Sequence, residues 1–243
     1  MNRSSLLVIK EICRREMSYY FRSSIGWWVF AIMLSLIGLF GNYYMISKES
    51  AFKAIQMILY DFSGGAMFLG IVLSMRLIAE EKAQGTIELL FTSPVSEWQV
   101  VLGKYFSAVI FLFLLLVLSL PVILITTILG DAGWGQLVSG YLGVLLIGSA
   151  TIAMGLFYSS LTRIQIVAGL LTAANLLIFL FFGFFSPFIS QPLKSVLREL
   201  SFYVHYMDFE KGVITTKHVL FFMGAIIFYL YLATFSISTR RFR

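Results

Sequence analysis

The stretch YFSAVIFLFLLLVLSLPVILITTILG, residues 105–130, contains no charged side chain. A helix needs about 20 apolar residues to cross the hydrocarbon core of a bilayer, and this stretch supplies that length without a break. Comparable runs recur along the chain and predict six transmembrane helices, near residues 25–45, 57–77, 106–129, 138–159, 165–186 and 218–236. The expected fold class is therefore all-α, a polytopic membrane protein whose residues 1–243 form a single transmembrane domain.

The overall composition is that of an integral membrane protein. Of 243 residues, 59% are hydrophobic and 12% are charged, and the mean hydropathy is +0.90, outside the usual range of soluble domains. The net charge of +6 is not accompanied by a recognisable nucleic-acid-binding module, so no nucleic-acid partner is expected. Cys13 is the only cysteine, which excludes an intrachain disulfide and a thiolate metal cluster.

The distribution of Lys and Arg predicts the orientation of the chain. An even number of spans places both termini on one side, and twelve basic residues fall on that side against six on the other. Cytoplasmic loops of membrane proteins are enriched in Lys and Arg. We therefore expect both termini, and the polar segment at residues 78–104, to face the cytosol.

Residues 1–22 have the pattern of an amphipathic helix that precedes the first span. Apolar side chains recur at helical spacing while charged ones occupy the other faces: Leu6, Ile9, Cys13, Met17 and Tyr20 against Lys10, Glu11, Arg14 and Arg15. This pattern favours a helix in the membrane interface, in contact with lipids. An ordinary helix packed on a soluble partner would show the same pattern.

Residues 78–104 form the one long polar interruption in the first half of the chain. Glu80 and Glu81 directly follow the second span, and Gly85 can release the backbone from helix. Pro94 then prevents a helix from continuing through the residues before it. These breaks predict a bent helical hairpin that projects from the membrane.

The second half of this hairpin carries a helix start and an apolar patch. Ser96 and Gln99 have the spacing of a capping box, which predicts a helix that runs into the third span. Between the two breaks lie four apolar residues, Ile87, Leu89, Leu90 and Phe91. Exposed apolar side chains are costly unless a partner covers them, so the hairpin is expected to be a docking surface.

The stretch EEKAQGTIELLFTSPVSEWQVVLGKYF, residues 80–106, resembles the signature region of ABC-2 type transporter permeases. The matching positions are Glu80, Glu81, Gly85, Thr86, Leu89, Leu90, Pro94, Val95, Gly103 and Lys104. The resemblance implies that the first eight of these form the interface that couples the permease to an ATPase, with the two acids as structural or electrostatic contacts rather than catalysts. Together with the six-span plan, the resemblance covers nearly the whole chain.

The resemblance implies a permease subunit, most simply an exporter, in the bacterial cytoplasmic membrane. The chain lacks the G-x-x-x-x-G-K-[ST] phosphate loop, so ATP and Mg²⁺ are expected on a separate ATPase subunit and not on this chain. A second copy, or a related permease, would complete the pathway as a homodimer or heterodimer. The alternative is an ATPase-coupled membrane scaffold that does mechanical or regulatory work without transporting a substrate.

A second stretch, SFYVHYMDFEKGVITTKHVLFF at residues 201–222, is similar to the segment before the last span of gliding-motility-associated permeases. The matching positions are His205, Phe209, Gly212 and Val213. It belongs to an extracytoplasmic segment, residues 187–217, in which the spacing of Leu193, Val196, Leu197 and Leu200 predicts a short amphipathic or re-entrant helix.

Two polar residues within the spans are candidates for a transport pathway. Asp61 in the second span would be either an intramembrane acid or a residue at the membrane interface. Asn175 in the fifth span would line a pathway or make a hydrogen bond between helices.

An intramembrane enzyme is the rival class. The chain has no H-E-x-x-H motif, and position 85 is glycine where the E-E-x-x-x-R element of prenyl-protein proteases has arginine. His205 and His218 are expected on the membrane face opposite Glu80 and Glu81. No catalytic residue and no metal site are therefore predicted.

Overall fold

The computed structural model describes residues 3–46, 51–86, 95–130, 134–185, 190–191 and 193–241, and the described part contains helices and no strand. Six of its helices are long: α2 (Ser24–Ile46), α3 (Ala51–Ser74), α6 (Glu97–Gly130), α7 (Trp134–Leu161), α8 (Gln165–Phe185) and α11 (Thr216–Arg241). Four others are shorter: α1 (Arg3–Arg22), α4 (Ala79–Ala83), α9 (Leu193–Leu200) and α10 (Phe202–Glu210). The predicted all-α fold is confirmed.

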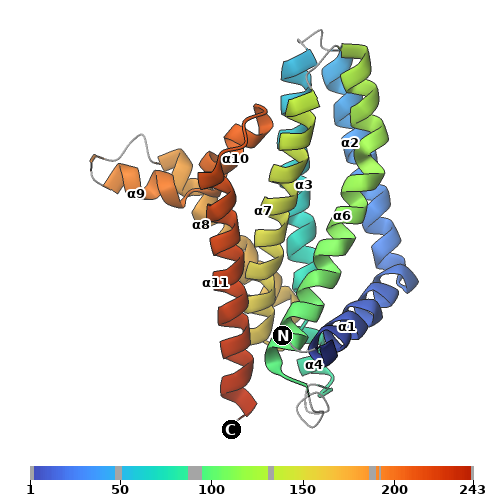
Figure 1. Ribbon diagram of the computed structural model, residues 1–243, viewed down its shortest axis with the longest axis vertical. Helices are drawn as coiled ribbons and strands as arrows, with labels where there is room; N and C mark the ends of the chain where they lie inside the picture. Colours follow the sequence, from blue (N-terminus) through green and yellow to red (C-terminus); the bar gives the residue numbers. More distant parts are fainter. Residues whose placement is uncertain are drawn as a thin grey trace.

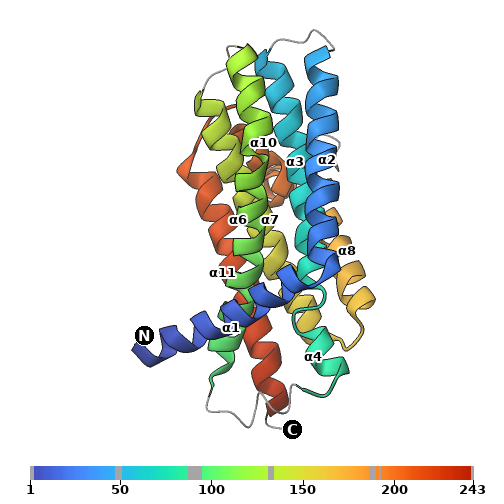
Figure 2. The ribbon, with the colours of Figure 1, turned by 90° about the vertical axis from the view of Figure 1, so that its right-hand side faces the viewer.

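The predicted number of membrane spans is also confirmed. Within the described residues, six stretches are long and apolar enough to cross a membrane: Gly26–Tyr44, Phe52–Ala83, Glu97–Ile125, Trp134–Leu161, Gln165–Phe185 and Thr216–Thr239. They form an elongated bundle, and the start of α1 and the end of α11 lie toward the end that also carries α4 (Figures 1 and 2). This arrangement follows from an even number of spans.

Helix α1 crosses the end of the bundle instead of joining it, as Figure 2 shows. It packs mainly on α6. Gly103 permits this close approach, because a Cβ atom at that position would lie 2.8 Å from the Ile12 side chain and 3.2 Å from the Ile9 carbonyl oxygen. The Gly-Lys pair at residues 103–104 therefore has a structural reason: the glycine admits α1, and the lysine beside it meets the charged side chains of α1.

Helix α7 is the central element of the bundle, and most of its length is buried. Its glycines face different neighbours at close range. A Cβ atom on Gly143 would lie 2.6 Å from Phe209 of α10, and one on Gly148 would lie 2.6 Å from Leu112 of α6. Small residues on this helix thus serve backbone packing.

The segment between α8 and α11 folds into the two short helices α9 and α10. Helix α9 has no buried residue and extends sideways from the bundle (Figure 1). Helix α10 instead packs against α7 and α8, and the Tyr206 hydroxyl donates a 2.7 Å hydrogen bond to the Leu59 carbonyl of α3. Gly212, with φ of +89°, ends this helical segment in a conformation that favours glycine.

Candidate functional site

The site is built where α3 ends and the short helix α4 begins. Between these two elements some backbone groups have no partner within a helix, and Ser159 at the end of α7 forms hydrogen bonds with them. Its Oγ accepts hydrogen bonds from the backbone N–H groups of Ile78 (3.1 Å) and Ala79 (2.9 Å) and donates to the Met75 carbonyl (3.0 Å). The Lys82 ammonium also donates to the Ser160 carbonyl, so α4 is fixed to the end of α7.

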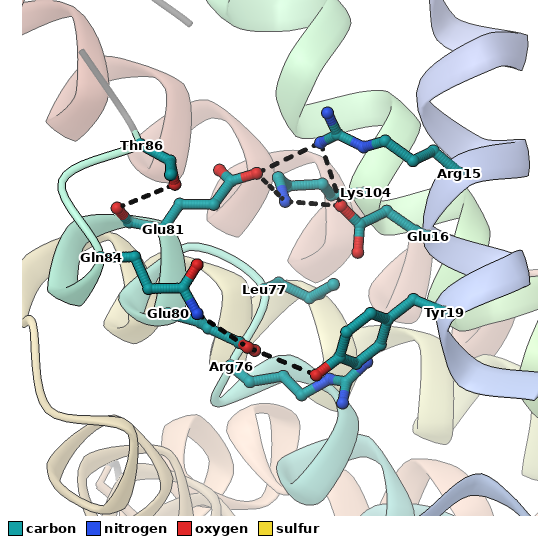
Figure 3. A pocket seen from close by; sticks show the side chains of 10 residues that line it. All are labelled: Arg15, Glu16, Tyr19, Arg76, Leu77, Glu80, Glu81, Gln84, Thr86 and Lys104. Atoms are coloured by element: carbon teal, nitrogen blue, oxygen red, sulfur yellow. Dashed lines mark hydrogen bonds and ion pairs between the residues drawn. The ribbon is translucent and has the colours of Figure 1, made fainter. Parts of the chain in front are cut away.

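Four charged side chains from three helices meet beside α4, and we refer to Arg15, Glu16, Glu81 and Lys104 as the ion cluster (Figure 3). The Lys104 Nζ lies 2.9 Å from a carboxylate oxygen of Glu16 and 2.9 Å from one of Glu81. The Arg15 guanidinium lies 3.4 Å and 3.3 Å from the same two oxygens. Helices α1, α4 and α6 are therefore joined through one set of alternating charges.

Burial makes the ion cluster sensitive to the loss of a partner of Lys104. The Lys104 side chain is only 1% exposed, and an unpaired ammonium in that position would be strongly unfavourable. Burial alone would raise the pKa of Glu16, but the charges of Lys104 and Arg15 outweigh it and hold that pKa below its usual value. The two acids and the two bases leave the cluster with no net charge.

Glu80 turns away from the ion cluster and contacts α1 one helical turn further along. Its Oε1 accepts hydrogen bonds of 3.4 Å from the Tyr19 hydroxyl and the Gln84 amide (Figure 3). The Arg76 guanidinium stacks over the rings of Tyr19 and Tyr20, with 4.2 Å and 4.7 Å to their centroids. The acid pair of the sequence thus divides its contacts: Glu81 pairs with the buried Lys104 and with Arg15, and Glu80 accepts from neutral donors at the surface.

The ion cluster and the groups around Glu80 line one cavity of about 450 Å³. Its walls are polar and charged, and they come from α1, α4, the turn before α4 and the first part of α6. Within the described ranges, no group of three or more His, Cys, Asp and Glu side chains could hold a metal ion. The arrangement suits transmission of a displacement between helices better than bond-making chemistry.

The remaining residues of the predicted interface flank this cavity or fall outside the described residues. Gly85 ends α4 with φ of +71°, and the Thr86 hydroxyl donates to the Glu81 carbonyl at 3.3 Å. Val95 is half-buried just before α6, which begins at Glu97. Leu89, Leu90 and Pro94, predicted to belong to the interface, lie outside the described residues, as do Ile87 and Phe91 of the apolar patch.

The predicted helix start before the third span has the expected geometry. The Gln99 side chain accepts a 3.0 Å hydrogen bond from the Ser96 backbone N–H, which is one half of a capping box. Glu97 lies in the first turn of α6, where a negative charge interacts favourably with the helix dipole.

Asp61 and Asn175 lie on different helices and make separate interhelical hydrogen bonds. The Tyr44 hydroxyl of α2 donates to Asp61 at 2.8 Å, and the Asn175 amide of α8 donates to the Tyr229 hydroxyl of α11 at 2.7 Å. Asp61 also lines a second cavity, in which Asn175 takes no part.

The histidine of the second resemblance is part of another polar group, which we call the imidazole cluster: Glu199, His205, Asp208 and His218. The Nδ1 atoms of the two histidines are 2.6 Å apart. The His218 Nε2 lies 2.8 Å from an Asp208 carboxylate oxygen, and the His205 Nε2 lies 2.8 Å from the Glu199 carbonyl oxygen. These contacts join α9, α10 and α11.

Sequence reasoning missed most of the residues that α1 and the turn before α4 contribute to the first cavity. Arg15 was assigned to the polar face of an interfacial helix, and Arg76 was counted only toward the positive charge of a loop. Glu16 and Tyr19 received no assignment. The one usable signal was the Gly-Lys pair at the start of the third span, because a lysine entering a membrane helix needs an acidic partner.

The fold and the cavity beside α4 define a polytopic helical membrane protein with a charged junction at one end of its bundle. A family model described as ABC-2 family transporter protein matches residues 11–238, so the chain belongs to this family. It is accordingly a transporter's membrane subunit, a permease without catalytic function of its own. No curated protein matches the chain. The resemblance to gliding-motility-associated permeases stays a prediction.

Proposed function

We propose that this chain is the permease subunit of an ABC-2 exporter and that a separate ATPase drives it by docking on residues 78–104. The observation that carries the proposal is the ion cluster. It connects α4, which lies inside the proposed docking region, to α1 and α6, while Ser159 connects the start of α4 to α7. A force applied to α4 would therefore act on three other helices.

The proposed transmission relies on the burial of Lys104 within the cluster. If α4 moved alone, Lys104 would lose its contact with Glu81 in a place that water barely reaches. Separating such a pair leaves buried charges uncompensated, so moving the connected helices together costs less free energy. ATPase closure would then displace α1 and α6 with α4, and α7 would follow through Ser159.

The remaining parts of the proposed assembly are those that the family implies. ATP and Mg²⁺ would bind to the ATPase, a second copy of this chain or a related permease would complete the pathway, and lipids would surround the spans. Residues 78–104 and both termini would face the cytosol of a bacterial cell. ATP-dependent uptake of substrate into inside-out vesicles would support export, whereas uptake only into right-side-out vesicles would contradict it.

The docking region can be tested by photo-crosslinking in native membranes. Gln84 is exposed at the end of α4, so a photoreactive amino acid there leaves the ion cluster intact, which a substitution of Glu81 would not. Gly135 is the matched control, because it is exposed near the start of α7, toward the opposite end of the bundle, and an added side chain meets nothing within 4 Å.

We expect mass spectrometry to identify a protein with a phosphate-loop motif crosslinked at position 84 and not at position 135. Capture of that protein at both positions, or at neither, would contradict docking on residues 78–104. An ATPase that crosslinks at position 84 but supports no ATP-driven movement of any solute would instead favour the scaffold alternative.

A further inference from the structure

A second cavity, of about 810 Å³, opens between α3, α8 and α10, away from the ion cluster. Its walls are mainly apolar and aromatic, and Met67, Phe181, Phe184, Tyr60 and Tyr203 are among them. The volume lies in the range of about 300–1,000 Å³ that is usual for small-molecule sites. Since no helix of the described chain closes it, the cavity is accessible from outside the bundle.

Asp61 is the one carboxylic acid among the described residues that line this cavity. The other polar groups deeper in the wall are already engaged: the Ser63 hydroxyl donates to the Tyr60 carbonyl at 2.7 Å, and the Tyr206 hydroxyl donates to the Leu59 carbonyl at 2.7 Å. Asp61 accepts one hydrogen bond, from Tyr44, which fixes the carboxylate at the cavity wall. Among the described residues, no Lys, Arg or His forms an ion pair with it.

An acid in an apolar, aromatic cavity selects for charge as well as for size. A carboxylate within a membrane span is unfavourable unless a cation accompanies it. The faces of Tyr60 and Tyr203, whose rings meet edge to face with centroids 6.1 Å apart, also attract cations. An anionic ligand would be repelled by Asp61, and a neutral acyl chain would leave the acid without a partner.

We propose that this cavity binds hydrophobic monovalent cations, in which an ammonium or phosphonium centre carries an apolar or aromatic body. The cationic centre would lie against Asp61 and the body against the aromatic wall from α8 and α10. Resting on the proposed permease function, this inference also names the class of substrate that the permease would move.

The test compares two probes of the same shape and opposite charge, tetraphenylphosphonium and tetraphenylborate. Equilibrium dialysis against the purified chain in lipid nanodiscs measures binding of each. We expect tetraphenylphosphonium to bind, tetraphenylborate to bind at least tenfold more weakly, and Asp61→Asn to weaken phosphonium binding at least tenfold. The asparagine keeps the size of the side chain and an acceptor for the Tyr44 hydroxyl.

Two further variants separate loss of the site from loss of the fold. Gly64 lines the cavity and an added Cβ there meets nothing within 4 Å, so Gly64→Phe is expected to fold normally and to abolish phosphonium binding by filling the space. Glu11→Gln removes one exposed acid from α1, outside the cavity, and is expected to leave binding unchanged.

Equal binding by wild type and Asp61→Asn, or binding of the two probes with similar affinity, would overturn the inference and would indicate a cavity for lipid chains only. The assay needs no ATPase, so its outcome is independent of the crosslinking experiment. If the ATPase is captured but the cation does not bind, the permease proposal stands and the cation site is refuted. If the cation binds but no ATPase is captured, docking on residues 78–104 is refuted and the cation site stands.

Discussion

The ion cluster and the imidazole cluster each join three helices with four polar residues, but they use different chemistry. The ion cluster consists of carboxylate, ammonium and guanidinium groups, whose ordinary pKa values lie outside the range from pH 5 to 8. The imidazole cluster depends on two histidines, the residue type whose ordinary pKa lies within that range. Changes of pH near neutrality should therefore act on the segment that contains α9 and α10 and leave the junction beside α4 unaffected.

The imidazole cluster also has a hydrogen requirement that the ion cluster lacks. Each of its three contacts needs one hydrogen. The Asp208 carboxylate and the Glu199 carbonyl can only accept, so each needs an N–H from the histidine ring that faces it. A third hydrogen is needed between the two Nδ1 atoms. Two neutral rings carry two hydrogens, so the three contacts cannot all be hydrogen bonds while both rings are neutral. A further hydrogen has no room between Nδ1 atoms 2.6 Å apart.

The largest effect is expected from removing the buried cation of the ion cluster. Lys104→Met should lower the free energy of unfolding by about 3 kcal/mol, because it leaves Glu16 and Glu81 close together without their buried partner. Unfolding in mixed detergent micelles measures the loss, and hydrogen exchange should show α1 detached from α6.

Arg15→Gln is the control within the same cluster. The Arg15 side chain is 62% exposed, so its removal should cost less than about 1 kcal/mol. Equal losses for the two variants would show that burial does not decide the strength of this cluster, and the proposed transmission through Lys104 would lose its basis.

An intermediate effect is expected from acid at the imidazole cluster. Burial lowers the pKa of His205, and the charge of His218 lowers it further. The stability that goes with a lowered histidine pKa is present above about pH 6.5, the ordinary value, and is lost as pH falls below it, because the unfolded chain takes up the proton first. The loss should not exceed about 1.4 kcal/mol per pH unit for one proton.

A thermal unfolding series from pH 7.5 to 5.0 measures this dependence. His205→Asn should flatten it, and Arg15→Gln should keep the wild-type slope. The other groups that face His205 are Asp208, His218 and the pair of Glu199 with Lys217. The hydrogen bond from Lys217 holds the pKa of Glu199 below its usual value, so Glu199 keeps its charge through the series. Identical slopes for wild type and His205→Asn would refute the assignment.

The smallest effect is expected from the exposed ion pair beside the imidazole cluster. Lys217 and Glu199 are 2.6 Å apart, but their side chains are 56% and 52% exposed. Lys217→Gln should therefore change the free energy of unfolding by less than about 1 kcal/mol, and the change should shrink further in high salt. A loss as large as that of Lys104→Met would mean that α9 is covered by a partner in the assembly.

The coupling region shows where sequence patterns stop being sufficient. The breaks at Gly85 and before Glu97 were predictable, because glycine conformation and capping are local. The separate roles of Glu80 and Glu81 were not, although adjacent helical residues are known to point in directions about 100° apart. Glu81 is the one that meets the buried Lys104, and it also meets Arg15, 66 positions earlier in the chain.

The sequence by itself determined the fold class, the six spans and the location of a polar region between the second and third spans, since the hydrophobic effect and local backbone preferences act over short stretches. Only the tertiary structure decided that α1 returns across α6, that Lys104 is buried between two acids and that Asp61 borders a cavity. These features come from contacts between residues far apart in the chain, where shape and distance, rather than composition, set the energy of each charge.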